Sequence, residues 1–463
     1  MTRQDRAPGI LAPDVRWLTV GILTVITLVA FEAMAVATAM PVAVADLDGL
    51  PSYAWAFSGY LVTSLVAMVV AGEVCDERGP RGPLVVGLAV FGVGLVVAGA
   101  APGMAVFVLG RALQGVGGGA IIVAIYVVVG RAYESERRPR LFAALSSAWV
   151  LPSIIGPVIA GAVAERLTWR LVFLAVPVLL VAPAVLLVPR LVALEGGQPG
   201  GRAGRKRAAV AGAAGLALVQ YGLQRLDGLG VVSLVVGAAL LVPTVTLLLP
   251  PGTLRFARGL PTSIAMRGVL AGSFFGAETF VPLMLVTERG LSATLAGLTL
   301  TGSALGWAVG SWHQGRPTTA TPRERLVQGG SAIVAGSIAG VALVLAPAVP
   351  AVVAAVAWSI GGLGMGLGMA SIAVAVLELS PVEDQGANSA ALQVCDALFS
   401  VVFIGVGGAV YAYAHSRADL QTAGFVVIFA AMALLAGLGA LMAPRLRPAA
   451  VPSAGGGPAA PRT

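Results

Sequence analysis

Residues 109–120 read Leu-Gly-Arg-Ala-Leu-Gln-Gly-Val-Gly-Gly-Gly-Ala and lie inside an apolar run of about 25 residues, long enough for a helix to cross a bilayer. An arginine at mid-membrane costs about 3 kcal/mol or more on insertion, so Arg111 should face a protein partner or a wet cavity. On a helix Arg111, Gln114, Gly115 and Gly118 share one face, because they stand at i, i+3, i+4 and i+7. The pattern predicts a helix that lines a transport pathway. The alternative is a helix-packing seam whose arginine reaches the headgroups.

The composition excludes a soluble protein. Of the 463 residues 58% are hydrophobic and only 11% are charged. A soluble domain with this balance would lack the polar residues that cover a water-facing surface. We therefore expect an all-α polytopic membrane protein.

The distribution of charged residues, cysteines and histidines excludes several classes of function. The net charge is +8, but no run of alternating basic and aromatic residues suggests a nucleic-acid partner. Cys75, in a short charged loop, and Cys395, in an apolar segment, suggest no disulfide framework, and His313 and His415 stand at segment ends. No metal-ligand spacing, dinucleotide loop after a strand or ATP-binding loop is present. We expect no metal, no cofactor and no enzyme activity.

Fourteen apolar segments are long enough to be membrane spans. They cover residues 17–44, 53–73, 83–100, 104–130, 141–164, 170–189, 208–225, 229–249, 263–287, 291–312, 326–346, 350–377, 388–414 and 420–443. The seventh is the weakest, since Gln220, Gln224 and Arg225 stand in its second half. If the seventh and eighth both fail to span, twelve helices remain and every other orientation is unchanged.

The arginines agree with this map. With the N-terminus in the cytoplasm, 23 of the 29 basic residues fall on the cytoplasmic side, 5 fall outside and Arg111 stays in the membrane. The outer five are Arg166, Arg170, Arg225, Arg289 and Arg417. Cytoplasmic loops of membrane proteins carry such an excess. We expect a cell-membrane protein with both termini in the cytoplasm.

The spans divide into domains. Residues 190–207 read as a flexible basic linker. We expect a six-helix bundle at 1–190, the linker and two linking helices at 191–260, a second six-helix bundle at 261–445, and a disordered cytoplasmic tail at 446–463. Glu32 in the first span and Glu278 in the ninth suggest that the two bundles repeat one plan.

One charged loop carries a resemblance. Residues 72–81 match the pattern G-x-x-x-D-R-x-G-R-R at Gly72, Asp76, Gly79 and Arg81, whereas Glu77 replaces its first base with an acid. This pattern is similar to the loop between the second and third helices in the major facilitator superfamily. The resemblance implies a conformational latch at these residues, altered by Glu77.

Three further motifs resemble the fourteen-helix drug:proton antiporter branch of that superfamily. Residues 109–120 resemble its fourth-helix motif, whose arginine is associated with proton coupling, and that role falls on Arg111. Gly156 and Pro157 match the centre of the antiporter motif of the fifth helix, although Pro152 and Ala160 depart from it. Glu32 takes the acidic position of the first-helix motif. The resemblance is specific over the first 190 residues and loose after residue 260.

The acids within the spans are candidate proton carriers. We expect Arg111 to tune the proton affinity of Glu32, with Glu278 as the counterpart of Glu32 in the second bundle. Asp396, with Gln393 and Ser400 on its helical face, suggests a polar patch toward the lumen, and Gln114, Gly115 and Gly118 should line the substrate cavity. The alternatives are that Glu32 is a protonated packing residue, that Glu278 is a buried acid bonded to Ser273, and that Asp396 is structural.

The sequence therefore predicts a proton-coupled efflux transporter. Its substrate would be a hydrophobic or cationic molecule such as a drug or antibiotic, moved by alternating access. A dedicated exporter of one metabolite, natural product or lipid shares the same fold and is the closest alternative. A membrane-embedded transferase would require a polar catalytic loop, and the sequence shows none. A receptor that does not transport would not need the pair of Arg111 and Glu32. The small aqueous faces suggest a monomer.

Overall fold

The computed structural model describes residues 10–134, 137–194, 203–223, 225, 227–314, 321–381, 385–417 and 420–448. This part of the chain is helical without strands, as predicted. The first long helices are α1 (Arg16–Asp46), α2 (Trp55–Arg78), α3 (Arg81–Gly99), α4 (Met104–Ala132), α5 (Arg138–Val163) and α6 (Trp169–Leu187). The rest are α7 (Ala203–Leu223), α8 (Gly228–Leu248), α9 (Leu260–Glu278), α11 (Ala293–Gln314), α12 (Arg323–Leu343), α13 (Val352–Leu379), α14 (Gln385–His415) and α15 (Gln421–Met442). A short helix, α10 (Val281–Thr287), follows α9.

Each predicted span is occupied by one of these fourteen helices, except that the ninth, 263–287, is divided between α9 and α10. By length and composition, eleven stretches of the described residues can cross a membrane; the stretch 151–192 joins α5 to α6, and neither α7 nor α11 is among the eleven. Helix α7 is apolar only over the short stretch Val210–Leu223, and α11 carries seven Ser, Thr, His and Gln residues. That α7 and α8 both cross the membrane stays a prediction.

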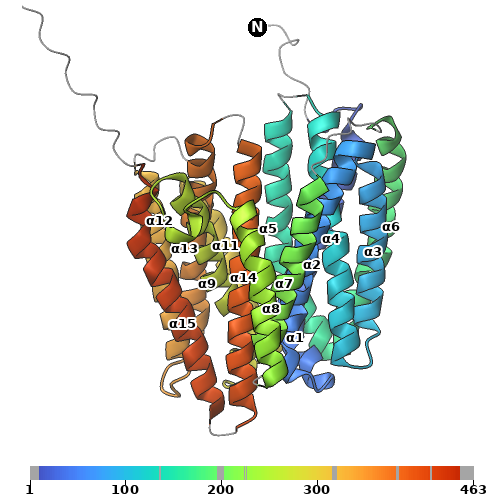
Figure 1. Cartoon of the computed structure of the whole chain (residues 1–463). Helices are drawn as coiled ribbons and strands as arrows, with labels where there is room; N and C mark the ends of the chain where they lie inside the picture. Colours follow the sequence, from blue (N-terminus) through green and yellow to red (C-terminus); the bar gives the residue numbers. More distant parts are fainter. Residues whose placement is uncertain are drawn as a thin grey trace, which may run out of the picture.

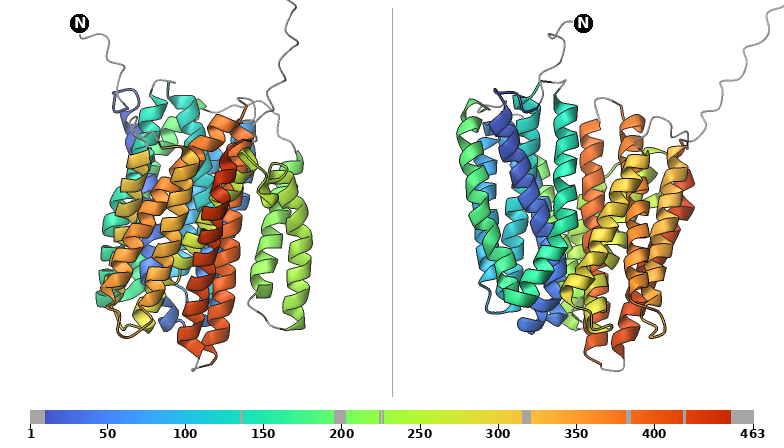
Figure 2. Two further views of the ribbon diagram at one scale, coloured as in Figure 1. Left: turned by 90° about the vertical axis from the view of Figure 1, so that its left-hand side faces the viewer. Right: turned by 180° about the vertical axis from the view of Figure 1, so that it is seen from behind.

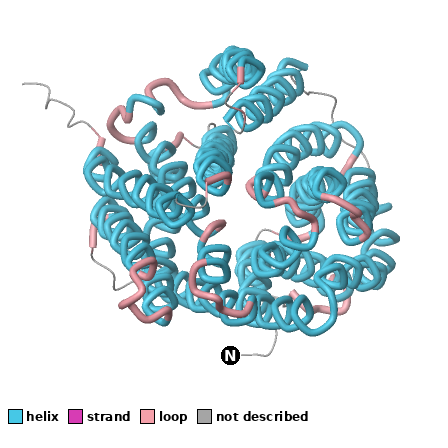
Figure 3. The backbone as a smooth tube through the Cα atoms, turned by 90° about the horizontal axis from the view of Figure 1, so that it is seen from below, coloured by secondary structure: helices cyan, strands magenta, loops and turns pink. Residues whose placement is uncertain are grey.

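The helices form two groups (Figures 1 and 2). In the first group α2 and α3 both pack on α4, and α1 packs on α5 and α6. In the second, α13 packs between α11 and α12, and α14 and α15 pack on α9. Figure 3, seen along the helices, shows the two groups side by side. We call the face where α1 begins, at the top of Figure 1, the N-terminal face. The predicted domain limits at 190, 260 and 445 stay predictions.

The linking helices α7 and α8 form a pair where the groups meet. Gly215 and Gly237 let their backbones approach closely, since a Cβ at either would lie 2.8 Å from the other's carbonyl oxygen. On its other side α7 contacts α2 of the first group and α14 of the second. The predicted linker 190–207 is shorter than expected: Val188–Leu194 form a 3-10 turn and α7 begins at Ala203. Residues 195–202 lie outside the described part, as does the predicted tail from residue 449.

The predicted loop between the second and third spans is mostly helical. Helix α2 continues to Arg78, so Gly79 and Pro80 alone separate it from α3. Gly79 has φ of 91°, a conformation that other residues avoid, and its N–H caps the helix on the Cys75 carbonyl. Cys75 is therefore buried in a helix and does not lie in a loop. Arg131 of α4 also donates to the Cys75 carbonyl, at 2.9 Å, and so ties this end of α2 to α4.

The two groups touch at the face opposite the N-terminal face. The Tyr53 hydroxyl, before α2, donates to the Thr279 carbonyl after α9 at 2.8 Å. Beyond the end of α5, Glu165 accepts from the Thr294 N–H in the first turn of α11 at 2.6 Å. Aromatic rings of both groups surround Tyr53, including Phe57, Phe280 and Tyr411. We call these contacts the opposite-face seal.

Candidate polar node and motif residues

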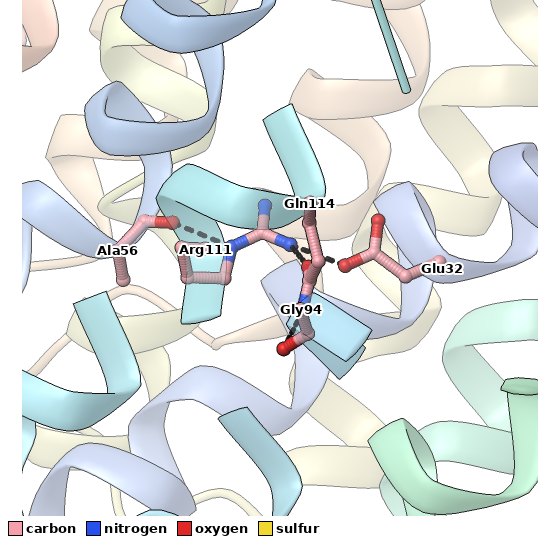
Figure 4. A network of polar contacts seen from close by, with 5 residues as sticks. All are labelled: Glu32, Ala56, Gly94, Arg111 and Gln114. Carbon is pink, nitrogen blue, oxygen red and sulfur yellow. Dashed lines mark hydrogen bonds and ion pairs between the residues drawn. The ribbon is translucent and has the colours of Figure 1, made fainter. Parts of the chain in front are cut away.

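Arg111 is the centre of a polar node that joins four helices (Figure 4). Its Nε donates to the Ala56 carbonyl of α2 at 2.7 Å, and its NH1 donates to Glu32 of α1 and to Gln114 of α4. The Gln114 amide in turn donates to the Gly94 carbonyl of α3 at 3.2 Å. The node thus links α1, α2, α3 and α4 through one guanidinium group.

The node is almost sealed from solvent. Arg111 is 4% exposed, Glu32 2% and Gln114 0%. The ring of Tyr60 lies 4.9 Å from the guanidinium carbon, which adds a cation–π contact. Arg111 therefore has the protein partners that its position demands. One carboxylate oxygen of Glu32, Oε2, has no hydrogen-bond partner among the described residues.

Glycines allow the four helices to approach this closely. A Cβ at Gly115 would lie 2.2 Å from the Tyr60 carbonyl oxygen, and one at Gly118 would lie 2.4 Å from the Tyr60 hydroxyl. On the other side of α4, a Cβ at Gly117 would lie 2.3 Å from the Phe91 nitrogen. The predicted cavity residues Gln114, Gly115 and Gly118 thus contact α2 and α3 in this structure and line no open space. Helix packing, the alternative weighed for this stretch, explains the glycines.

Asp396 forms an ion pair with Arg267 and does not form the polar patch that the sequence suggested. Its carboxylate accepts from Arg267 Nε of α9 at 2.6 Å, and both side chains are 19% exposed. Of its predicted neighbours on α14, Ser400 is buried without a hydrogen-bond partner among the described residues, whereas Gln393 is exposed. The three residues do not converge on one site.

Glu278 ends α9 and is half-buried. It faces the indole N–H of Trp358, although the separation exceeds a hydrogen bond. Its predicted alternative partner, Ser273, donates instead to the Leu270 carbonyl. Phe274 stacks on Trp358 with ring centroids 4.6 Å apart, so an aromatic cluster lies beside the acid.

The fifth-helix motif lies where the groups meet. A Cβ at Gly297 of α11 would lie 2.6 Å from Thr38 of α1 and 3.2 Å from Pro157 of α5. Gly156 lies against Phe31 and Met34 of α1. Both motif residues thus face other helices at the joint between α1, α5 and α11.

The predicted latch residues gather at the N-terminal face. Gly72 lies near Val123 of α4, Gly79 caps α2 and Arg81 begins α3. The side chain of Asp76 lies outside the described part. Arg131, which sequence reasoning did not single out, ties α4 to the end of α2 and also to the Leu194 carbonyl, at 3.4 Å.

The chain matches one known family over most of its length. Residues 22–404 match the Major Facilitator Superfamily. A protein of Mycobacterium tuberculosis named "Probable multidrug-efflux transporter" is 30% identical over 373 residues, which make up 76% of this chain and 78% of that protein. The "Multidrug transporter protein MdtP" of Bacillus subtilis is 33% identical over 156 residues, 34% of this chain and 29% of that protein.

Solved structures share the fold. A crystal structure of a POT family transporter with a thioalcohol-conjugated peptide superposes with a TM-score of 0.71, over 95% of this chain and 98% of that chain. The human organic anion transporter MFSD10 superposes with a TM-score of 0.61, over 93% and 99%. At 14% and 12% identity these likenesses show the fold alone. The profile match and the M. tuberculosis relative show the family: the chain is a multi-pass membrane transporter that belongs to the major facilitator superfamily.

Proposed function

We propose that this transporter exports hydrophobic or cationic drugs or antibiotics in exchange for protons, as a multidrug efflux pump of the cell membrane. The names of the M. tuberculosis and B. subtilis relatives support the substrate class. The observation that carries the proposal is the buried ion pair between Glu32 and Arg111. Two opposite charges are costly to bury at this depth in a membrane, and helix packing alone does not require them.

The coupling follows from the geometry of the node. When Glu32 takes a proton it loses its charge, and Arg111 is left with the Ala56 carbonyl and Gln114 as partners. A buried cation without its counter-ion is costly, so protonation changes which packing of α1 against α4 is favoured. Binding one proton therefore biases the two-state equilibrium that alternating access requires. Glu278 and Asp396 are proposed as further acids of the cycle.

The orientation rests on charge. The N-terminal face carries most of the described arginines, and the opposite face carries Arg166, Arg170, Arg225, Arg289 and Arg417. We therefore place the N-terminal face in the cytoplasm. The opposite-face seal would then close the outer side, and the transport cycle would have to open it. Each molecule is proposed to work as a monomer.

A transport assay in proteoliposomes tests the proposal. The membrane carries a proton gradient, a pH-sensitive dye is trapped inside, and lipophilic cations and uncharged antibiotics are added in turn. Wild type should move protons when a substrate is added, and Glu32→Gln should lose uphill transport. Glu134→Gln, an exposed acid on the N-terminal face, is the control and should behave as wild type.

Two results would contradict the proposal. If Glu32→Gln pumps substrate uphill as wild type does, Glu32 does not couple the proton. If wild type moves no protons with any compound of the panel, the second candidate function applies, which is a dedicated exporter of one metabolite, natural product or lipid.

A further inference from the structure

Helix α9 is enclosed by its neighbours except along one stripe. Of residues 262–285, only Arg267, Phe275 and Glu278 are not buried. Phe275 and Glu278 follow Arg267 by eight and eleven residues, so all three lie within about 80° of one another around the helix axis. We call these three residues the open stripe. Helices α13, α14 and α15 pack on α9. Because charged side chains are costly to expose to acyl chains, the open stripe faces a wet space inside the protein.

Glu278 stands at the end of the open stripe next to the opposite-face seal and has no counter-ion among the described residues. It forms no ion pair there, and the Trp358 indole N–H that it faces lies beyond hydrogen-bond geometry. Phe275 is its neighbour one turn earlier on the helix. The ring of Phe275 lies 6.2 Å from that of Trp307 of α11, and both rings are half-buried. An unpaired carboxylate beside aromatic rings favours an organic cation.

Arg267, at the other end of the open stripe, is engaged through one nitrogen. Its Nε donates to Asp396 of α14 at 2.6 Å, whereas NH1 and NH2 donate to no described residue. Both side chains of the pair are partly exposed. Because Asp396 compensates the charge of Arg267, this end favours a neutral hydrogen-bond acceptor, such as a carbonyl oxygen, over a second charge.

The charges around the open stripe add up to one negative charge. The acids and arginines of α9, α11, α13, α14 and α15 are Arg267, Glu278, Asp396 and Glu378. Glu378 pairs with Arg323, the first residue of α12. Arg267 and Asp396 cancel, so the remaining charge is that of Glu278. The two ends of the open stripe stand about 16 Å apart at the rise of an α-helix.

We propose that the open stripe binds an elongated monocation, with its ammonium group on Glu278 and a neutral carbonyl group on Arg267. The apolar middle of the molecule lies on Phe275 and Trp307. This inference rests on the proposed function and narrows its substrate class to cations that carry a distant carbonyl group. A carboxylate at that end binds less tightly, because Asp396 repels it. Glu278 holds a proton when the cation has left, as its place in the proposed cycle requires.

Equilibrium binding to the full-length protein in neutral detergent tests this assignment. The main probe is 12-aminododecanamide, an amine whose extended chain is about as long as the open stripe and ends in a carbonyl group. Dodecylamine lacks the carbonyl group, 12-aminododecanoic acid carries a carboxylate in its place, and 6-aminohexanamide is too short to join both ends. Isothermal titration calorimetry gives each affinity, with a blank titration into protein-free micelles.

Two variants separate the ends of the open stripe. Arg267→Gln removes the donors to the carbonyl group, and Glu278→Gln removes the charge that holds the ammonium group. The matched controls are Arg325→Gln of α12 and Glu134→Gln, because both side chains are exposed. Glu278→Gln loses no ion pair with a described residue, so its thermal unfolding midpoint should not fall below that of wild type.

Wild type should bind 12-aminododecanamide roughly tenfold more tightly than dodecylamine, the effect of one hydrogen bond to a charged group. It should bind 12-aminododecanoic acid and 6-aminohexanamide less tightly than 12-aminododecanamide. Arg267→Gln should abolish the preference for the amide and leave dodecylamine binding unchanged, which a misfolded protein would not do. Glu278→Gln should weaken both amines, and the controls should bind as wild type.

Equal affinity of wild type for 12-aminododecanamide and dodecylamine would overturn the proposal. So would a preference for the amide that survives Arg267→Gln, tighter binding of the carboxylate probe, or no binding of any probe. None of these results decides the proposed function, because proton-coupled export is tested separately by Glu32→Gln in proteoliposomes.

Discussion

Glu32 and Arg111 stabilise the first group only as a pair. Removing one partner of a buried ion pair leaves an uncompensated charge and costs about 3–5 kcal/mol. Arg111→Met should therefore lower the free energy of unfolding by about that amount, measured by denaturant titration in mixed micelles. Adding Glu32→Gln to Arg111→Met should recover part of the loss, because no bare carboxylate then remains. If Arg111→Met and the double variant are destabilised equally, side-chain packing and not the ion pair stabilises the polar node.

Asp14 makes an ion pair whose strength depends on pH. Its carboxylate accepts from Arg137 at 2.8 Å, and this hydrogen bond holds the pKa of Asp14 below its usual value of 3.8. Because the folded pKa is lower than the unfolded one, the pair stabilises the fold above pH 3.8. The stabilisation is lost as the pH falls through the lowered folded value.

The measurement compares thermal unfolding midpoints of wild type and Asp14→Asn. The difference should be small, favour wild type at pH 7, and vanish as the pH drops below 3.8. The effect is small because Asp14 is exposed to solvent. A difference that is the same at pH 7 and pH 3 would assign the effect of Asp14→Asn to something other than its charge.

At the scale of elements, glycine decides how closely α11 and α13 pack. A Cβ at Gly306 would lie 2.0 Å from the Ser359 carbonyl oxygen, which cannot move without its helix. Gly306→Ala should therefore destabilise the protein by about 1–3 kcal/mol through overpacking. Gly336 of α12 is the matched control, since nothing lies within 4 Å of its Cβ position. There Gly336→Ala should stabilise by up to about 1 kcal/mol, because alanine is the better helix former.

Unfolding of the two variants side by side checks this prediction. The same direction of change in both would mean that helix propensity, and not the contact with α13, governs Gly306.

The helices could be predicted from the sequence, because the length of an apolar run and the positions of charges depend on neighbours in the chain. The end of α2 could not, because a charged segment before Gly79 and Pro80 reads as a loop, and the contact of this segment with Arg131 comes from another helix. Nor could the partner of Asp396, because Arg267 stands 129 residues away in the chain. The pairing of Glu32 with Arg111, which are 79 residues apart, is expected from the resemblance of their two motifs and not from the helical pattern. A helical pattern shows which face a residue takes but not which helix packs against it.

At the scale of the whole molecule, the opposite-face seal joins the two groups. Tyr53 donates to Thr279 and Glu165 accepts from Thr294, so each contact joins the two groups. Gly297 packs on Thr38 close to these contacts, and Thr38 is fully buried there. If the two groups separate at this face, Thr38 becomes accessible, and its accessibility therefore reports the conformation.

Tyr53→Phe should shift the molecule toward the state that is open at this face. The change keeps the ring and removes one buried hydrogen bond, worth about 0.5–1.5 kcal/mol, or roughly a 2- to 13-fold change in the equilibrium. A Thr38→Cys reporter should then react faster with an impermeant maleimide by up to that factor. The native Cys75 and Cys395 are buried and give a low background. Tyr413→Phe is the control, since Tyr413 is exposed on α14 and, among the described residues, its hydroxyl bonds only to Arg417 of the same group. Equal labelling of the Tyr53→Phe and Tyr413→Phe proteins would mean that the bond from Tyr53 to Thr279 does not hold this face closed.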